Sequence, residues 1–489
     1  MAIGDLPWAP WTIVLPLIAS ALVIVLGGRR APVVGVSSVI VTALFACAAL
    51  MRLASVGPER HAVGGWEAPL GIELMLDGWG VGFVALTSVV SLAVAGYAAH
   101  SWQGDVLRKR FWSLFLILQG GLNALFLSGD LFNLYVTLEV VGVSAAGLTA
   151  MERKREAVGA ALRYLLLSLA GSFSYLAAVV LVYQEHGTLD LALLAGRNAE
   201  TPLATATVAL MTAGLILKTA LFPFHTWLPP AHTSAPAPVS ALLSGLVVKG
   251  SFFVLLRIAL LTWPVLWGGG VALLLGLLGS AAVFWGYGQA LRSERLKTMI
   301  AYSTVAHIGQ LFVVFPLAAA GSPIAAGAIF LLAASHALAK SAAFLSAGNV
   351  QRATGSDRLE DLAVCAPRMP MTQVTLALAS LSLVGLPPSA GFLGKWLLLE
   401  ASIATRQWLW PCVLVAGTAL SAVLMLRILQ GTLAARLEAA PPMTDIPRAC
   451  EWIPLALAIV AAVLGALGGP ILTLTQQVTG SAARLGGAL

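Results

Sequence analysis

Charged residues are scarce in this 489-residue sequence. Asp, Glu, Lys and Arg together make up 10% of it, against ~25% in an ordinary soluble domain. In a chain with long apolar runs, this shortage excludes a water-soluble enzyme, a disordered chain and a nucleic-acid-binding protein. The 28 basic and 21 acidic residues leave a formal net charge of +7, which is typical of a membrane protein with basic cytoplasmic loops.

Cysteine is equally scarce, and its distribution excludes several kinds of site. Cys47, Cys365, Cys412 and Cys450 are scattered, form no CxxC pair and have no histidine at ligand spacing. This pattern argues against a structural metal, an iron–sulfur cluster and a disulfide framework. The motifs GxxxxGK[ST], GxSxG, HExxH and a helix-opening GxGxxG are also missing. We therefore expect no cofactor and no metal ion.

Apolar residues are abundant: they make up 59% of the sequence, enough for about fourteen bilayer spans of ~20 residues. The apolar runs are continuous rather than alternating, which favours helices over a β-barrel. The predicted fold is an all-α polytopic membrane protein. Its expected spans lie near residues 10–28, 32–52, 79–99, 111–128, 131–151, 160–183, 204–226, 238–262, 267–290, 297–317, 324–350, 372–402, 408–433 and 452–475.

The first apolar run, Pro7 to Gly28, has its positive pair, Arg29 and Arg30, after it instead of before it. A signal peptide has the opposite order. We therefore interpret this run as a retained first span with its N-terminus outside.

Basic residues are concentrated in alternate connections between the predicted spans. Sixteen lie in odd-numbered connections: Arg29, Arg30, Arg108, Lys109, Arg110, Arg153, Lys154, Arg155, Arg292, Arg295, Lys297, Arg352, Arg358, Arg368, Arg436 and Arg448. Five lie on the other side: Arg52, Arg60, Arg197, Arg406 and Arg484. Because cytoplasmic loops carry the excess of Lys and Arg, we expect the odd-numbered connections in the cytoplasm, both termini outside and an even number of spans.

Prolines interrupt two otherwise apolar segments. Pro223 interrupts the segment 215–232, and Pro387 and Pro388 interrupt the segment 382–400. Proline removes a backbone donor and clashes with the preceding turn. Each segment is therefore predicted to be a broken helix whose freed carbonyls face protein or a wet cavity.

A lysine accompanies each predicted break, in reversed order. Lys218 precedes the first break and Lys395 follows the second. This reversal is what an inverted structural repeat would produce, and paired broken helices indicate a transport path. The alternative is a pair of unrelated proline kinks.

Four of the seven lysines, Lys218, Lys249, Lys340 and Lys395, lie within predicted spans. A charge inside the membrane costs several kcal/mol, so its retention argues for function. A buried lysine can release its proton, whereas arginine stays charged. We therefore expect these lysines to carry protons, the alternative being amines that reach the interface from helix ends.

An acidic residue, Glu139, lies in the same apolar environment, with no other charge between Asp130 and Glu152. A carboxylate at that depth should be protonated or paired with a cation. We predict Lys218 as its partner, with a hydrogen-bonded structural glutamate as the alternative. Asp130 follows Ser128 and Gly129 at the predicted helix start, which indicates an N-cap rather than a transport role.

Four histidines extend the predicted polar path or lie close to its break. His336 and Lys340 are four residues apart, hence on one helix face, where a proton could pass between them. His307, with Ser303 one turn earlier, is predicted on a neighbouring span. His232, like His225, flanks the first break without a third metal ligand, so we expect loop packing rather than zinc.

Several runs resemble the proton-translocating antiporter-like subunits that are shared by respiratory complex I, membrane-bound hydrogenases and multisubunit Mrp-type cation/proton antiporters. The runs are GDLFNLYVTLEV (129–140), LKTALFPFHTWLPPAHTSAPAPVSALLSGLVVK (217–249), RLKTMIAYSTVAHIGQ (295–310), SHALAKS (335–341) and GLPPSAGFLGKW (385–396). The first of them and VGGWEAPLGIELMLDGWG (63–80) most resemble the D-type component of Mrp antiporters. The segment HTWLPPAH (225–232) is more similar to the complex I and hydrogenase versions.

The resemblance implies fourteen transmembrane helices with two inverted five-helix repeats, each containing a broken helix. On this basis we expect N-terminal helices in 1–110, a first repeat in 111–262, a second in 267–433 and a C-terminal helix in 434–489. The resemblance also implies a transporter subunit, not an enzyme, that works in a bacterial cytoplasmic (inner) membrane with other membrane subunits.

The resemblance implies a role for each residue that matches a family motif. Glu139 and Lys218 would be the coupling pair, and Lys249 the central proton carrier. The connecting group would be His336 and Lys340, and Lys395 would be the terminal lysine. The expected function is cation/proton antiport with Na⁺ or another monovalent cation.

Two alternatives to antiport remain. The first is a proton-translocating subunit of a redox-driven or inorganic-carbon-uptake complex. The second is a membrane-embedded acyltransferase, which requires His225 or His232 to be exposed at one membrane face beside a substrate groove. The second alternative leaves the four intramembrane lysines unexplained.

Overall fold

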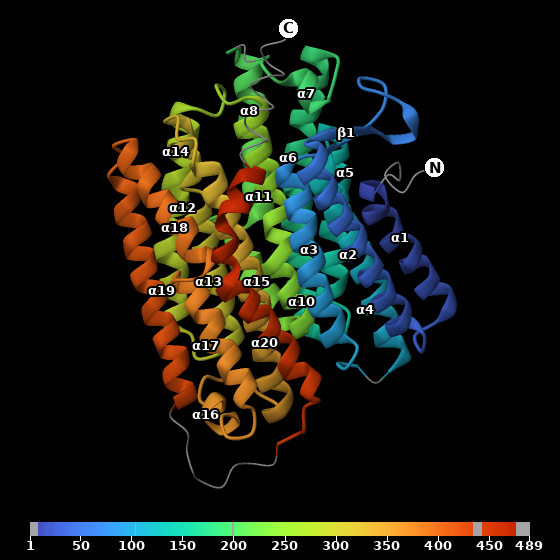
Figure 1. Cartoon of the computed structure of the whole chain (residues 1–489), viewed down its shortest axis with the longest axis vertical. Helices are drawn as coiled ribbons and strands as arrows, with labels where there is room; N and C mark the ends of the chain where they lie inside the picture. The colour runs from blue at the N-terminus through green and yellow to red at the C-terminus, as the bar shows by residue number, and fades with distance from the viewer. Residues whose placement is uncertain (1–7, 103, 198–199, 434–442, 476–489) are drawn as a thin grey trace.

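The computed structural model describes residues 8–102, 104–197, 200–433 and 443–475. These residues fold into a bundle of long helices with one two-stranded sheet at its edge (Figure 1). The first ten helices are α1 (Trp8–Leu26), α2 (Ala31–Val56), α3 (Gly78–Ala98), α4 (Asp105–Leu127), α5 (Leu131–Thr149), α6 (Arg155–His186), α7 (Leu191–Leu194), α8 (Pro202–Thr219), α9 (Leu228–Ser234) and α10 (Ala237–Leu242).

The second half of the chain continues the bundle. Its helices are α11 (Val248–Arg257), α12 (Gly269–Arg292), α13 (Leu296–Leu311), α14 (Val314–Ala319), α15 (Ala325–Thr354), α16 (Asp361–Cys365), α17 (Pro370–Val384), α18 (Ala390–Ala404), α19 (Leu409–Leu433) and α20 (Arg448–Val463). Short 3₁₀ turns cover Val63–Gly65, Phe224–Trp227 and Leu464–Leu467, and π-helical turns cover Leu243–Val247 and Ile258–Thr262.

The predicted all-α polytopic membrane architecture is confirmed. Thirteen helical stretches of the described residues are long and apolar enough to cross a bilayer. The pair α17 and α18 accounts for the remaining predicted span, the one expected at 372–402. Backbone groups in the membrane must be satisfied within the chain, which is why these apolar runs form helices.

The centre of the bundle is fully enclosed by other helices. In the stretches Ala237–Thr262 and Ala325–Thr354 the most apolar window is 100% buried, whereas the same window of α1 is 33% buried. The elements α10, α11, α13 and α15 therefore form the core, and α1, α2, α19 and α20 lie at its periphery (Figure 1).

Both predicted helix breaks are present. α8 ends at Thr219, and Ala220 has the left-handed backbone (φ 57°) that turns the chain toward Pro223. The indole Nε1 of Trp227 donates to the freed carbonyl of Leu217 at 3.1 Å. The second break separates α17 from α18 and contains Pro387 and Pro388.

A third irregularity was not predicted. The π-helical turn Leu243–Val247 joins α10 to α11 and packs tightly against α15. A Cβ at Gly245 would lie 2.4 Å from the Ser341 hydroxyl, so a larger residue there would force that hydroxyl to move. The turn breaks the regular ladder of backbone hydrogen bonds beside Lys249.

The connection between α2 and α3 also differs from the sequence prediction. It contains an antiparallel hairpin of β1 (Glu59–Ala62) and β2 (Glu73–Leu76). Arg60 on β1 forms ion pairs with Glu73 and Asp190. The hairpin is thereby fixed to the start of α7.

The basic connections gather at one end of the bundle. The α1–α2 turn, the α3–α4 connection and α16 lie at the lower end of Figure 1, whereas β1 and α7 lie at the upper end. Lys297, counted above among the basic residues of a connection, lies in the first turn of α13 and is 1% exposed. Its amine donates to the Ala235 carbonyl at 2.5 Å. Arg436 and Arg484 lie outside the described residues.

Candidate functional site

An ion pair between α5 and α8 forms one end of the candidate site. The amine of Lys218 donates to the carboxylate of Glu139 at 2.9 Å, which confirms the predicted partnership. The side chain of Lys218 is 5% exposed and that of Glu139 is 23% exposed. The carboxylate therefore reaches the edge of the bundle, while the amine points inward.

Helix α6 supplies two hydroxyl groups to this pair. Ser168 accepts from the Lys218 amine at 3.0 Å, and Ser172 donates to the Glu139 carboxylate. The two serines lie four residues apart and so share one helix face. α6 and α8 approach closely because Gly171 and Gly214 face each other, and a Cβ on either would lie within 2.7 Å of the other's carbonyl oxygen.

Lys249 lies beyond this pair, in the centre of the bundle. It is 1% exposed, and its amine donates to the Ser244 carbonyl at 2.7 Å. That carbonyl belongs to the π-helical turn. The Ser244 hydroxyl contacts the Thr304 hydroxyl on α13 at 2.9 Å, so the polar atoms continue from α11 to α13.

Lys340 on α15 contacts polar groups of the same helix, α13. The Lys340 amine on α15 donates to the Ile300 carbonyl at 3.0 Å and to the Ser303 hydroxyl. The Thr304 hydroxyl donates to the same Ile300 carbonyl. Lys249 and Lys340 are therefore connected through three residues by hydrogen-bonded polar atoms.

Two buried histidines stand beside Lys340. The rings of His307 and His336 lie 4.9 Å apart, and the Tyr287 hydroxyl contacts the His307 Nε2 at 3.2 Å. Neither ring nitrogen of His336 has a hydrogen-bond partner among the described residues. His336 and Lys340 share a face of α15 as predicted, but the Lys340 amine points to α13 instead of to His336.

Lys395 occupies the second helix break. Its amine donates to the carbonyls of Leu383 and Val384 at 3.2 and 2.9 Å. These are the last carbonyls of α17, which lack partners within the helix. Ser382, just before them, contacts the Ser335 hydroxyl of α15 at 2.7 Å. Ser335, the residue before His336, thus links α15 to the end of α17 that holds the Lys395 amine.

Comparison with known proteins places this arrangement in a family. Residues 128–421 match the model of the family described as NADH:quinone oxidoreductase/Mrp antiporter, transmembrane region. The chain belongs to this family. The match covers both helix breaks and the seven predicted proton-path residues.

Relatives in the family come from two kinds of complex. The N component of the NADH-quinone oxidoreductase of Desulforudis audaxviator is 34% identical over 381 residues, covering 76% of this chain and 75% of the relative. The D component of the Na⁺/H⁺ antiporter of Alkalihalophilus pseudofirmus is 26% identical over 372 residues, covering 75% and 74%.

Solved structures show the same fold. A chain of the archaeal membrane-bound sulfane sulfur reductase superposes with a TM-score of 0.89 at 26% identity, covering 98% of this chain and 99% of that one. A chain of the Mrp complex from Dietzia sp. DQ12-45-1b superposes with a TM-score of 0.88 at 23% identity, covering 98% of each.

The remaining sequence predictions have mixed outcomes in this family member. Asp130 is the N-cap of α5 and accepts from the Asn133 backbone N–H at 2.8 Å, as predicted. His225 and His232 are 6% and 0% exposed. An acyltransferase reaction at an exposed histidine is therefore contradicted. No group of three or more potential metal-ligating side chains occurs in the described part of the chain.

Sequence reasoning missed the hydroxyl groups and one histidine. Ser168, Ser172, Ser244 and Thr304 all contact the site, but serine and threonine are common small residues in membrane helices. The four-residue spacing of Ser168 and Ser172 was the available signal. His232, expected in a loop, instead stacks on Phe344 with ring centroids 4.9 Å apart.

Proposed function

We propose that this chain is the proton-translocating membrane subunit of a multisubunit Na⁺/H⁺ antiporter in a bacterial cytoplasmic membrane, where it works with other membrane subunits. The observation that carries the proposal is the set of buried lysines that are held by carbonyl and hydroxyl oxygens inside the bundle. It comprises Lys218 in its pair with Glu139, Lys249, Lys340 and Lys395.

The partners of the inner lysines suit proton transfer. Lys249, Lys340 and Lys395 donate to carbonyl and hydroxyl oxygens, and they form no ion pair within the described residues. Such oxygens accept a hydrogen bond from an ammonium group and from a neutral amine alike. Each amine can therefore gain or lose a proton and still keep its hydrogen-bond partners.

The Glu139–Lys218 pair serves as the gate of this path. When the pair is closed, the carboxylate stabilises a positive charge on Lys218. Opening the pair leaves that charge without its anion, which favours passing a proton toward Lys249. Coupling along the line is electrostatic, because a charge on one lysine disfavours a charge on the next. His307 and His336 extend the relay between Lys249 and Lys395.

A second candidate parent is a redox-driven or inorganic-carbon-uptake complex, in which electron transfer or another reaction elsewhere in the complex drives the same proton path. The relative at 34% identity belongs to an NADH-quinone oxidoreductase, whereas the Na⁺/H⁺ antiporter relative is 26% identical. The chain is thus similar to members of both kinds of complex.

Purification of the tagged chain from its native membrane in a mild detergent, followed by mass spectrometry, separates the two parents. Small hydrophobic subunits together with sodium-dependent proton flux in vesicles would support the antiporter. Soluble iron–sulfur, hydrogenase or carbonic-anhydrase-like partners without sodium dependence would contradict it and support the second candidate.

A further inference from the structure

A pocket of about 570 Å³ lies at the basic end of the bundle, between the start of α6, the end of α9 and the start of α13. Three arginines, Arg155, Arg163 and Arg295, line it, together with one acid, Glu156. The side chains therefore bring three positive charges and one negative charge to the pocket. This excess suits an anionic group.

Two of these arginines are free to bind a ligand. Arg155 and Arg163 are exposed and make no hydrogen bond or ion pair among the described residues. The third, Arg295, uses its Nε on Asp357 at 2.8 Å. Arg163 lies further along α6 than Arg155 and therefore deeper in the membrane. Because helical side chains point back toward the helix N-terminus, the Arg163 side chain extends toward the pocket.

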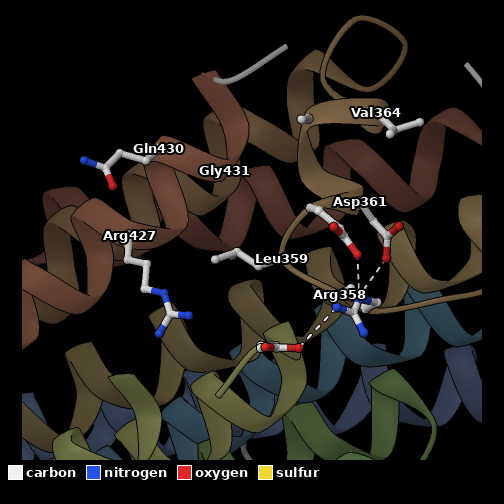
Figure 2. A pocket seen from close by; sticks show the side chains of 10 residues that line it. Arg358, Leu359, Asp361, Val364, Arg427, Gln430 and Gly431 are labelled. Atoms are coloured by element: carbon white, nitrogen blue, oxygen red, sulfur yellow. Dashed lines mark hydrogen bonds and ion pairs between the residues drawn. The ribbon is translucent and has the colours of Figure 1, made fainter. Parts of the chain in front are cut away.

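In a larger pocket at the same end, the positive charge is neutralised by neighbouring acidic side chains. This pocket has a volume of about 670 Å³, and Arg358 is its central cation (Figure 2). The guanidinium of Arg358 is paired with Glu294 at 3.1 Å and with Glu360 at 2.6 Å. Among the residues that the structure describes, the larger pocket therefore has no pair of unpaired guanidinium groups like Arg155 and Arg163. Of the two pockets, the one at α6 has two arginines whose charge is not neutralised by an acidic partner in the described part of the chain.

An apolar stripe continues from the α6 pocket toward the middle of the membrane. Leu162, Leu166 and Phe173 are 52%, 66% and 66% exposed. At 100° per residue, these three positions lie within about 20° of the Arg155 direction around the helix. The charged pocket and the apolar stripe thus belong to one face of α6, with the charge at the membrane surface.

We propose that this pocket binds the phosphate headgroup of an anionic phospholipid, whose acyl chains lie along the exposed face of α6. Arg155 and Arg163 bind the phosphate oxygens through charge-assisted hydrogen bonds. Leu166 and Phe173 contact the acyl chains. Basic pockets between membrane helices on the cytoplasmic side are suited to such headgroups, and the stripe distinguishes a lipid from free phosphate.

The test is native mass spectrometry of the chain, purified with any subunits that stay bound and incubated with equal amounts of phosphatidylglycerol and phosphatidylcholine. We expect the wild type to retain phosphatidylglycerol in preference. The double variant R155Q/R163Q should lose this preference by about tenfold, as two charge-assisted contacts are removed. The variant R155K/R163K should keep most of it, since both positive charges remain.

The matched control is K154Q/R358Q, which removes the same net charge from the same end. Lys154 pairs with Glu152 at 2.7 Å, and neither control residue lines the α6 pocket. The control should bind phosphatidylglycerol like the wild type. Equal loss in the control would mean that net charge alone attracts the lipid, which overturns the site.

Three further outcomes would also overturn the proposal. The first is equal retention of both lipids by the wild type. The second is displacement of the lipid by millimolar inorganic phosphate, which would indicate a free-phosphate site. The third is loss of a bound partner protein, with lipid unchanged, in R155Q/R163Q, which would assign this surface to an acidic protein partner.

Discussion

At the scale of single residues, Lys249 and Lys395 are held by backbone carbonyls at irregular points of the helices. The Lys249 amine donates to a carbonyl of the π-helical turn, and the Lys395 amine donates to the last carbonyls of α17. The last carbonyls of α17 lack partners within the helix and would otherwise be buried without one, at a cost of about 1–3 kcal/mol each. Helix irregularity therefore creates the places where a lysine can be held inside the membrane.

The Ser172 hydroxyl is predicted to tune the gate. Because it donates to the Glu139 carboxylate, Ser172→Ala should remove a hydrogen bond worth about 1.5–3 kcal/mol and reduce proton flux by roughly tenfold. Flux in proteoliposomes containing equal amounts of assembled protein measures this. Ser174→Ala is the control, since Ser174 on the same helix donates only to the Leu210 carbonyl at 2.8 Å. Equal loss in both variants would contradict a specific role.

At the scale of elements, the sequence predicts the breaks that proline causes and misses the one that has no proline. The two breaks could be predicted from Pro223, Pro387 and Pro388, because proline cannot donate a backbone hydrogen bond within a helix. The π-helical turn has no proline, and within it Gly245 lies against Ser341 of α15, a residue almost a hundred positions away in the sequence. Lys297 stands at the predicted start of the span 297–317, and its burial comes from contact with the carbonyls of Thr233 and Ala235, which the sequence does not relate to it.

The contact between α12 and α13 is predicted to depend on glycine. A Cβ at Gly286 would lie 2.6 Å from the Ala306 backbone nitrogen and 2.8 Å from the Tyr302 carbonyl. Gly286→Ala should therefore separate the two helices and destabilise the protein by about 1–3 kcal/mol. Lower thermal unfolding midpoints of the purified protein in detergent would show this.

Gly288 on the same helix provides the control for this prediction. A Cβ there would meet nothing within 4 Å, so Gly288→Ala should be neutral or stabilising by about 0.5–1 kcal/mol. An unchanged midpoint for Gly286→Ala, or an equal fall for Gly288→Ala, would contradict the close helix approach seen in the structure.

At the scale of the whole molecule, the membrane orientation follows from the basic end of the bundle. We expect α16 to face the cytoplasm and the α7 end to face outward. The matched variants Glu360→Cys and Glu200→Cys, in a background with the exposed Cys47 and Cys412 replaced by Ser, test this. An impermeant thiol reagent should label Glu360→Cys only in inside-out vesicles and Glu200→Cys only in right-side-out vesicles. The reverse pattern would contradict the orientation.

The helical form of the spans and the lysines inside them could be predicted from the apolar runs and the positions of lysine and proline. The order in which the lysines connect could not, because it depends on contacts such as Ser244 with Thr304, between the turn that precedes α11 and α13, which the sequence does not relate. The division of the chain into two inverted five-helix repeats stays a prediction.

In the proposed path, protons cross the bundle through Lys249. The most direct measurement is proton flux in proteoliposomes that contain the assembled complex with Lys249→Ala, with assembly verified by the recovery of all wild-type subunits. We predict that flux falls by more than about tenfold, equivalent to ~1.4 kcal/mol or more in the transport barrier. Normal assembly with undiminished flux would contradict the proposed path.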